Sequence, residues 1–348
     1  TSVNPDPMLD PRTLHSRLFT IDTHIDIPWP DRGDAFGPSD RRVDLAKMQQ
    51  GGLKAGCFAA YIPQGPLTSE GEAAAFERAR AMLAAIGAMS GNRNGIEAHG
   101  AQSAADIETI WRAGALAVVP AVENGYAIGT NLERLEILAA LGARYLTLTH
   151  NGHNALGDSA VPRTDLGDRE ARHGGLSKFG HAAIDRMNRL GIMIDVSHAA
   201  KSTMLQAIAA SRAPVAATHS SVHALCHHPR NLDDEQLDAL AERGGVVQIT
   251  AVPGFLRPNG KAAEVGVIDF VDHIDYAVRR VGIAHVGISS DFDGGGGFHG
   301  WHDASESRNL TAELLRRGYD ETAIAALWGG NFLRVMRAVE ALAEGAAR

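Results

Sequence analysis

The sequence predicts an α/β fold, a (β/α)8 TIM barrel, from the number of its apolar segments and from what separates them. Short runs rich in Val, Ile, Leu and Thr, bounded by Gly, Pro, Asn or Asp, are typical of strands. They cover residues 19–26, 53–62, 116–123, 145–150, 192–198, 215–219, 245–250 and 286–291. Eight strands close a parallel barrel, and a barrel of about this length folds as one domain. We therefore expect a single domain over residues 1–348.

The segments between these runs carry helix signals, as parallel strands require helical crossovers. Five clear examples cover residues 71–88, 132–141, 179–190, 233–243 and 269–281. Gly191 ends the third of them, as a glycine at a helix C-terminus should. The rival fold, an open doubly wound sheet, predicts a GxGxxG turn after the first strand. The sequence there is Thr23-His24-Ile25-Asp26-Ile27-Pro28, which favours the barrel.

Composition limits the possible partners of the chain. It is 45% hydrophobic and 21% charged, a balance typical of a soluble protein with a large core. A net charge of -8 disfavours nucleic acid, because phosphates would be repelled. Cys57 and Cys226 are far apart, which predicts neither a disulfide framework nor a zinc ribbon.

No feature of the sequence indicates a membrane span, because no apolar stretch reaches the roughly 20 residues that one requires. The first 20 residues do not resemble a signal peptide. The chain begins at Thr1, so its location stays open between the cytoplasm and export to the periplasm after removal of a leader.

Histidines and carboxylates follow several of the predicted strands, where barrel enzymes place their reactive side chains. His24 and Asp26 end the first run on one face, Glu123 ends the third, and His198 and His219 end the fifth and sixth. Each alone could be a surface or capping residue. Their repetition at four strand ends predicts a metal site, and imidazole with carboxylate is a ligand mixture that zinc accepts.

Asp291 ends the eighth run and could transfer a proton from a metal-bound water, or it could cap the following loop. Asp293 precedes Gly294 and is the expected turn former. We expect Asn331 to be a helix N-cap and His273 to be an ordinary helical histidine. The segment Cys226-His227-His228 is expected to be loop or packing, and no function is assigned to it.

The sequence resembles the membrane dipeptidases, also called renal dipeptidases, of the amidohydrolase superfamily. The matching segments lie at residues 21–26, 122–125, 145–151, 193–198, 228–232, 290–294 and 329–332. The resemblance implies a dipeptidase with two zinc ions, in which His24 and Asp26 hold one ion, His198 and His219 hold the other, and Glu123 bridges both.

The resemblance also implies roles for three further residues: His150 contacts the substrate carbonyl, Arg230 binds the substrate carboxylate, and Asp291 shuttles the proton. A guanidinium can fork onto a carboxylate, so Arg230 would favour peptides that end there. A homodimer, tolerance of a D-residue at the C-terminal end and β-lactam hydrolysis are further expectations from the resemblance. The additional His153 and the loop at 294–302 depart from the family pattern, and they leave substrate preference open.

Two alternatives stay open at this point. Another amidohydrolase, such as a deaminase or an acyl-amino-acid hydrolase, would use similar barrel ligands. A deaminase more often has HxH on the first strand, where this chain has His24-Ile25-Asp26. The second alternative is a barrel that binds a metal without catalysis. The sequence contains no HExxH, GxSxG or P-loop motif, so other common hydrolase chemistries are disfavoured.

Overall fold

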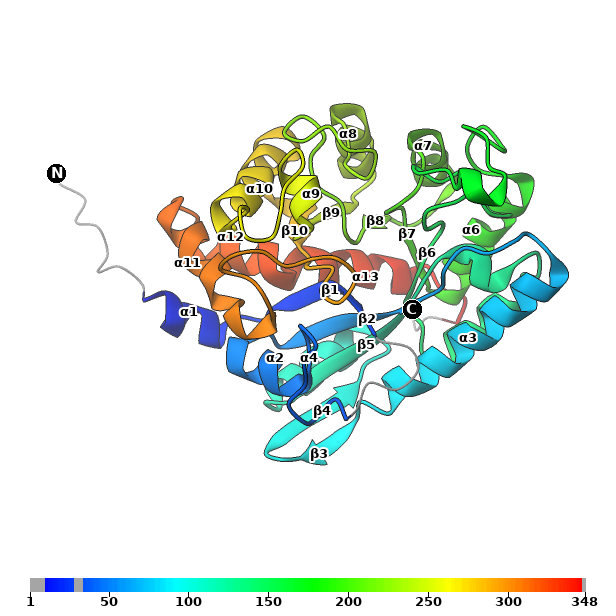
Figure 1. Cartoon of the computed structure of the whole chain (residues 1–348). Helices are drawn as coiled ribbons and strands as arrows, with labels where there is room; N and C mark the ends of the chain where they lie inside the picture. The colour runs from blue at the N-terminus through cyan, green and yellow to red at the C-terminus, as the bar shows by residue number, and fades with distance from the viewer. Residues whose placement is uncertain (1–9, 28–33, 346–348) are drawn as a thin grey trace.

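The computed structural model describes residues 10–27 and 34–345, which include a nearly closed barrel of eight parallel strands (Figure 1). The strands neighbour one another in chain order: β1 Ile21–Asp26, β2 Ala55–Tyr61, β5 Leu116–Glu123, β6 Tyr145–Thr147, β7 Met193–Asp195, β8 Ala216–Ala217, β9 Val246–Ile249 and β10 Val286–Ile288. After β10, the N–H of Asp291 donates to the carbonyl of His24, and Phe292 accepts from the N–H of Asp26, both at 3.0 Å. These bonds join the last strand to the first and confirm the predicted (β/α)8 barrel.

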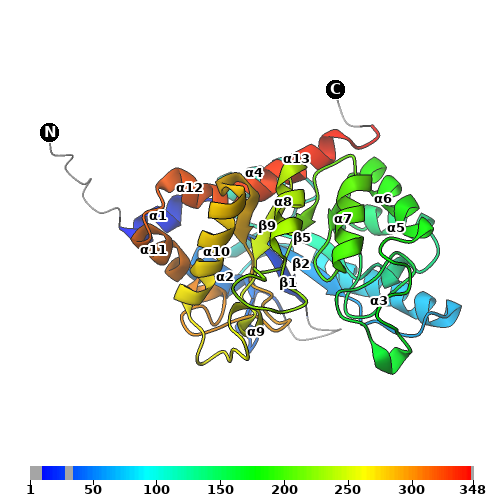
Figure 2. The ribbon, with the colours of Figure 1, turned by 90° about the horizontal axis from the view of Figure 1, so that it is seen from above.

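Helices surround the strands in the view from above (Figure 2). They are α1 Pro11–Arg17, α2 Leu45–Gly51, α3 Ser69–Gly87, α4 Ala104–Arg112, α5 Glu133–Ala140, α6 Lys178–Leu190, α7 Lys201–Ala210, α8 Asp234–Glu242, α9 Pro253–Leu256, α10 Val267–Val281, α11 Arg308–Arg316, α12 Glu321–Ala325 and α13 Asn331–Ala341. The five predicted helices correspond to α3, α5, α6, α8 and α10. Gly191 ends α6 in the left-handed region, at φ 72°, as predicted.

Several strands end earlier than the apolar pattern predicts. β7 stops at Asp195 and β10 at Ile288, whereas the predicted runs continue to His198 and Asp291. His198 and Asp291 have φ angles of 66° and 57°, which a strand cannot accommodate. The chain therefore leaves the sheet just before the residues that it presents at the barrel mouth.

A small hairpin is absent from the sequence prediction. β3 (Gly91–Arg93) and β4 (Ile96–Gly100) are antiparallel, and β4 pairs with the start of β5. Its residues are mostly exposed and polar, so no apolar run marks it. The Asn94-Gly95 turn, with φ angles of 56° and 74°, is the signal that could have identified it.

The expectation that Asn331 is a helix N-cap is wrong. The preceding π-helical turn, Ala326–Gly330, continues directly into α13, so the helix does not begin there. The Asn331 amide instead donates to the carbonyls of Ile283 and Val286, at 2.6 and 2.8 Å, and fastens the helix to the start of β10. Its role is structural, but it acts between elements.

The barrel interior positions Glu123. Ala117, Val119 and Ala121 alternate along β5 and belong to a buried cluster that also contains Tyr145 and Phe332 of α13. Glu123 follows at the same spacing and therefore faces the same interior.

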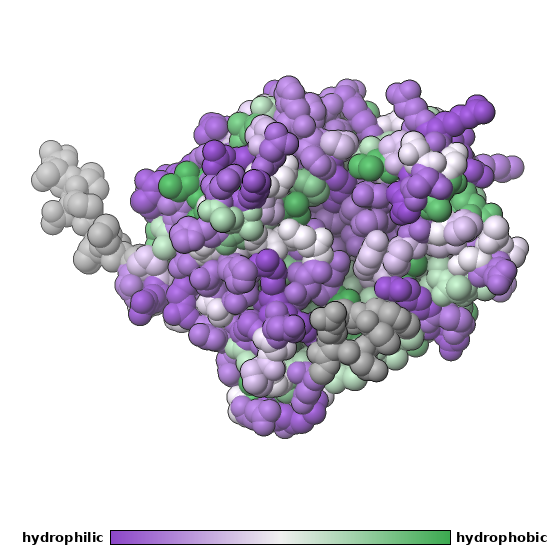
Figure 3. All heavy atoms as spheres, viewed as in Figure 1, coloured by the Kyte–Doolittle hydropathy of each residue, from purple (hydrophilic) through white to green (hydrophobic). Residues whose placement is uncertain are grey.

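The outer surface differs from this interior. The face shown in Figure 3 is predominantly hydrophilic, with hydrophobic residues scattered over it. Within residues 10–27 and 34–345, no helix is long and apolar enough to cross a membrane.

His273 is a buried histidine within α10, and both of its ring nitrogens make hydrogen bonds. Nδ1 accepts from the N–H of Val222, and Nε2 donates to the carbonyl of Leu256, both at 3.0 Å. These contacts tie α10 to the loop after β8 and to α9. Burial lowers the pKa of His273 to about 4, so the folded protein holds it neutral.

We predict that this histidine makes folding sensitive to acid. The unfolded chain takes up a proton near pH 6.5 while the folded chain does not, so stability is lost as the pH falls from about 6.5 to about 4. Urea unfolding of metal-free protein across this range should show a shallower pH slope in His273→Gln than in wild type. His181→Gln, at an exposed position of α6, serves as the control and should keep the wild-type slope. An equal slope in His273→Gln and wild type would contradict the prediction.

Candidate metal centre and active site

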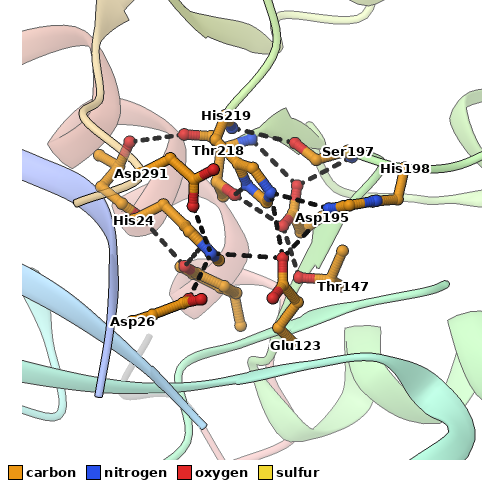
Figure 4. A network of polar contacts seen from close by, with 12 residues as sticks. His24, Asp26, Glu123, Thr147, Asp195, Ser197, His198, Thr218, His219 and Asp291 are labelled. Atoms are coloured by element: carbon orange, nitrogen blue, oxygen red, sulfur yellow. Dashed lines mark hydrogen bonds and ion pairs between the residues drawn. The ribbon is translucent and has the colours of Figure 1, made fainter. Parts of the chain in front are cut away.

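Three imidazoles converge on one carboxylate oxygen at the mouth of the barrel (Figure 4). His219 Nε2 lies 3.0 Å from Glu123 Oε2, and the Nε2 atoms of His24 and His198 each lie 3.3 Å from it. Asp26 Oδ1 is 3.1 Å from His24 Nε2. The structure thus brings all five predicted metal ligands together, although they come from four separate strand ends.

Asp291 belongs to the same cluster. Its Oδ1 lies 3.8 Å from His24 Nε2, and its side chain is almost fully buried. Gly294 lies directly against it, because a Cβ at Gly294 would be 2.5 Å from Asp291 Oδ1 and from Asp26 Oδ2. A larger residue at this point of the loop would therefore displace the two carboxylates.

The hydrogen bonds of His24 fix which ring nitrogen carries its proton. His24 Nδ1 lies 2.8 Å from the hydroxyl of Tyr145, and this hydroxyl donates to the carbonyl of Thr23 at 2.9 Å. Since the hydroxyl proton is used, Tyr145 must accept from the Nδ1–H of His24. The Nε2 lone pair of His24 is then free to face Glu123 and Asp26.

His219 and His198 have the same tautomer. Thr218 Oγ1 donates to Asp195 Oδ2 at 2.7 Å and so accepts from His219 Nδ1, 3.0 Å away. His198 Nδ1 lies 3.1 Å from Asn151 Oδ1, which can only accept. In its neutral form, each of the three imidazoles therefore points an unprotonated Nε2 into the cluster.

Asp195 is the common anchor behind these histidines. Its Oδ2 accepts from the hydroxyls of Thr147 and Thr218, and its Oδ1 accepts from the backbone N–H groups of Ser197 and Thr218. These four bonds link β6, β7 and the segment after β8. The carboxylate is saturated by neutral donors, so it positions ligands and is not itself a ligand.

The donor set fits metal ions. His198 Nε2 and His219 Nε2 lie 3.1 Å apart although neither carries a proton in the neutral tautomers above. His24 Nε2 and Asp26 Oδ1 are buried without a hydrogen-bond partner. Buried acceptors that face one another repel unless a cation lies between them. Glu123 belongs to two trios of possible ligand atoms. One trio also contains His24 and Asp26, and the other also contains His150 and His198.

The pKa values of the cluster show how strongly its charges interact. Burial alone would lower the pKa of His24, but the Glu123 and Asp26 carboxylates hold it well above its usual value. Burial raises the pKa of Asp26 to about 6, and burial together with the Asp26 charge holds the pKa of Asp291 well above its usual value. These carboxylates are therefore destabilised in their charged forms unless cations accompany them.

His150 lies beside the cluster, between two other rings. Its ring is 4.1 Å from that of His198 and 4.7 Å from that of Tyr61. Burial lowers the pKa of His150, which keeps the ring neutral and able to donate one hydrogen bond. It borders the same cavity as Glu123, and its contact with the substrate carbonyl stays a prediction.

Arg230 lies at the edge of the same cavity, which has a volume of about 400 Å³. Its Nη2 donates to the carbonyl of His219 at 2.9 Å, and its Nη1 donates to Ser220 Oγ at 3.3 Å. Its Nε is buried without a partner. Burial lowers the pKa of Arg230 to about 10, so the group stays charged at neutral pH and retains donors for an anion.

Tyr145, Asn151, Asp195 and Thr218 support the cluster but are not singled out by sequence patterns. They lie within or just after apolar runs, where a polar side chain has no distinctive spacing. His153 lies in a loop, as expected. It is buried, accepts from the N–H of Ser159 and donates to the carbonyl of Arg169, away from the cluster.

Known proteins resemble this chain in both sequence and fold. A sequence model of the membrane dipeptidase family, peptidase family M19, matches residues 9–348. Dipeptidase verJ of Clonostachys rogersoniana is 33% identical over 339 residues, which cover 92% of this chain and 84% of verJ. Dipeptidase aclJ of Aspergillus oryzae is 39% identical over 227 residues, or 65% of this chain, and the match spans about half of aclJ, 52%.

Solved structures agree with these matches. The probable dipeptidase PvdM of Pseudomonas aeruginosa superposes with a TM-score of 0.88 at 31% identity, covering 96% of this chain and 98% of PvdM. A metallopeptidase of Rhodobacter sphaeroides, solved with a phosphinate mimic of the dipeptide L-Ala-D-Ala, gives a TM-score of 0.78 at 26% identity, with 92% and 99% of the two chains covered.

The match to the family extends over nearly the whole chain, and the barrel mouth holds a set of side chains suited to metal ions. The chain therefore belongs to the membrane dipeptidase family, peptidase family M19, which is a family of metallopeptidases.

Proposed function

We propose that the protein is a binuclear zinc dipeptidase. The observation that carries this proposal is the convergence of three imidazole Nε2 atoms on Glu123 in a cavity that also contains a buried arginine. His24 and Asp26 would hold one zinc ion, His198 and His219 the other, and Glu123 would bridge them. Imidazole and carboxylate ligands with room for a water suit catalytic zinc.

The chemistry divides between the metals and the side chains. Zinc, when bound, lowers the pKa of a coordinated water so that it can attack at neutral pH. Arg230 would hold the C-terminal carboxylate of the substrate, and His150 would donate a hydrogen bond to the scissile carbonyl as negative charge develops on it. Asp291 would accept a proton from the attacking water on a carboxylate oxygen and return it to the departing amine.

The proposed substrates are dipeptides, including those with a D-residue at the C-terminal position. The Rhodobacter sphaeroides enzyme, solved with a mimic of L-Ala-D-Ala, supports this extension. We also propose a homodimer, which light scattering of the purified protein would test.

We predict that hydrolysis depends on the metal. Purified protein should cleave L-L, L-D or D-L dipeptides when loaded with zinc, lose this activity after chelation, and regain it when zinc is restored. N-acyl amino acids and nucleobases included in the assay separate the other amidohydrolase activities. Hydrolysis that survives complete metal removal would overturn the mechanism, and no hydrolysis of any dipeptide at full zinc occupancy would support a non-catalytic barrel.

We predict that Tyr145→Phe weakens zinc binding. The ring and its packing remain, but the Nδ1–H of His24 loses its acceptor, and loss of such a partner typically costs about 10- to 100-fold in metal affinity. Zinc competition with a chromogenic chelator measures this directly, without reference to activity. Tyr126→Phe is the matched control, because its hydroxyl donates to the carbonyl of Pro66, away from the ligands. Equal zinc affinity in Tyr145→Phe and wild type would contradict the prediction.

We predict that Arg230→Gln lowers kcat/KM for a dipeptide by roughly 100-fold or more, because a buried charge pair with the substrate is lost. The same dipeptide with an amidated C-terminus should be a poor substrate for wild type and should lose little further in the variant. Arg230→Lys retains the charge without the fork and should recover part of the rate. An equal fold-loss in kcat/KM for the dipeptide and for its C-terminal amide would show that Arg230 supports the structure and does not bind the substrate carboxylate.

A further inference from the structure

The cavity has an apolar wall beside Arg230, formed by Val252, Phe255 and His228. The Arg230 Cζ lies 5.3 Å from the centre of the Phe255 ring. The centres of the His228 and Phe255 rings are 4.4 Å apart. Phe255 comes from the short helix α9, and His228 comes from the loop that precedes Arg230. Two separate segments therefore meet to build this wall next to the guanidinium.

Hydrogen bonds hold the two segments together. The Asn231 amide donates to the carbonyls of Phe255 and Cys226, at 2.8 and 2.9 Å. The thiol of Cys226 donates to the carbonyl of Gly254 at 3.4 Å. Inside the loop, the N–H of Arg230 donates to His228 Nδ1 at 3.1 Å. The Cys226-His227-His228 segment, to which the sequence assigns no function, thus packs α9 against the arginine.

The wall is uncharged, in contrast to the rest of the cavity. Burial, together with the nearby Arg230, lowers the pKa of His228, so this ring is neutral at neutral pH. The other two members of the wall are hydrocarbon. Asp26, Glu123 and Asp291 line the same cavity elsewhere and provide the acidic surroundings of the metal site.

We propose that this apolar wall receives the side chain of the C-terminal residue of the substrate and selects apolar side chains there. The inference rests on the proposed function, because Arg230 must hold the carboxylate of that residue. A carboxylate is one bond from its Cα, so the side chain of the residue that Arg230 holds leaves the backbone next to Phe255. An apolar side chain there covers Phe255 and Val252, whereas a carboxylate side chain would lose its hydration against hydrocarbon.

The test uses zinc-loaded protein and dipeptides that differ only at the C-terminal residue: Ala-Gly, Ala-Leu, Ala-Phe and Ala-Asp, with L- and D-forms of the last three. We expect wild type to prefer Leu and Phe over Gly and Asp in kcat/KM by about tenfold or more, since one methylene in an apolar pocket is worth at least about tenfold. In Phe255→Ala, the ratio of Ala-Leu to Ala-Gly should fall by about tenfold.

Two further variants sharpen the result. Leu225→Ala removes an exposed apolar side chain from the same loop outside the cavity, and it should leave the ratio at the wild-type value. Phe255→Leu keeps an apolar side chain and should lower the Ala-Phe to Ala-Gly ratio less than Phe255→Ala does. It provides the measurement if the alanine variant does not fold.

The outcomes separate the two proposals. Dipeptide hydrolysis with no preference for Leu or Phe over Gly, or with a ratio that is unchanged in the Phe255 variants, would overturn the apolar subsite and leave the dipeptidase proposal intact. No hydrolysis of any of these dipeptides by zinc-loaded wild type would overturn both.

Discussion

The mutual repulsion of buried acceptors around Glu123 is the constraint on which the rest of the site depends. Three imidazole Nε2 atoms and the Asp26 carboxylate face the same small volume. The Nδ1–H groups of the three rings point outward, to Tyr145, Asn151 and Thr218. Leaving such groups unpaired in a protein interior costs several kcal/mol each. The arrangement is stable only with positive charge at its centre, and bound metal meets this need better than a single proton on His24.

The barrel supplies the precision that this arrangement requires. The five ligands come from the ends of four different strands, so small errors in the register between strands would separate them. Asp195 opposes such errors, because its four hydrogen bonds hold β6, β7 and the start of the loop after β8 in one register. The left-handed backbone at His198 and Asp291 then turns both side chains inward from the ends of their strands. The strain is local and is placed where function requires it.

The sequence predicts the barrel and the ligand cluster because both repeat. Apolar runs recur eight times, and a histidine or carboxylate ends several of them. The residues that support the ligands are not predictable in this way. The role of Tyr145, for example, depends on where the fold places its hydroxyl and not on its spacing in the sequence. The β3–β4 hairpin carries only one local signal, Asn94-Gly95. At Asn331 the sequence signal is present but misleading. An Asn after two glycines is typical of a helix start, although here the helix continues through the glycines.

Acidic side chains and a buried arginine line the same cavity, and under the proposed function this pairing of charges would determine where a peptide substrate ends. Arg230 is a buried cation whose Nε lacks a partner, so it gains most from an anion brought to it by a ligand. The metal cluster lies a short distance away in the same 400 Å³ cavity. If Arg230 holds the C-terminal carboxylate as proposed, a peptide with a further residue beyond the one that Arg230 holds would leave the cation without its anion. Arg230 would then select substrates with a single residue on the C-terminal side of the scissile bond, through the cost of an unsatisfied charge and independently of the shape of any side chain.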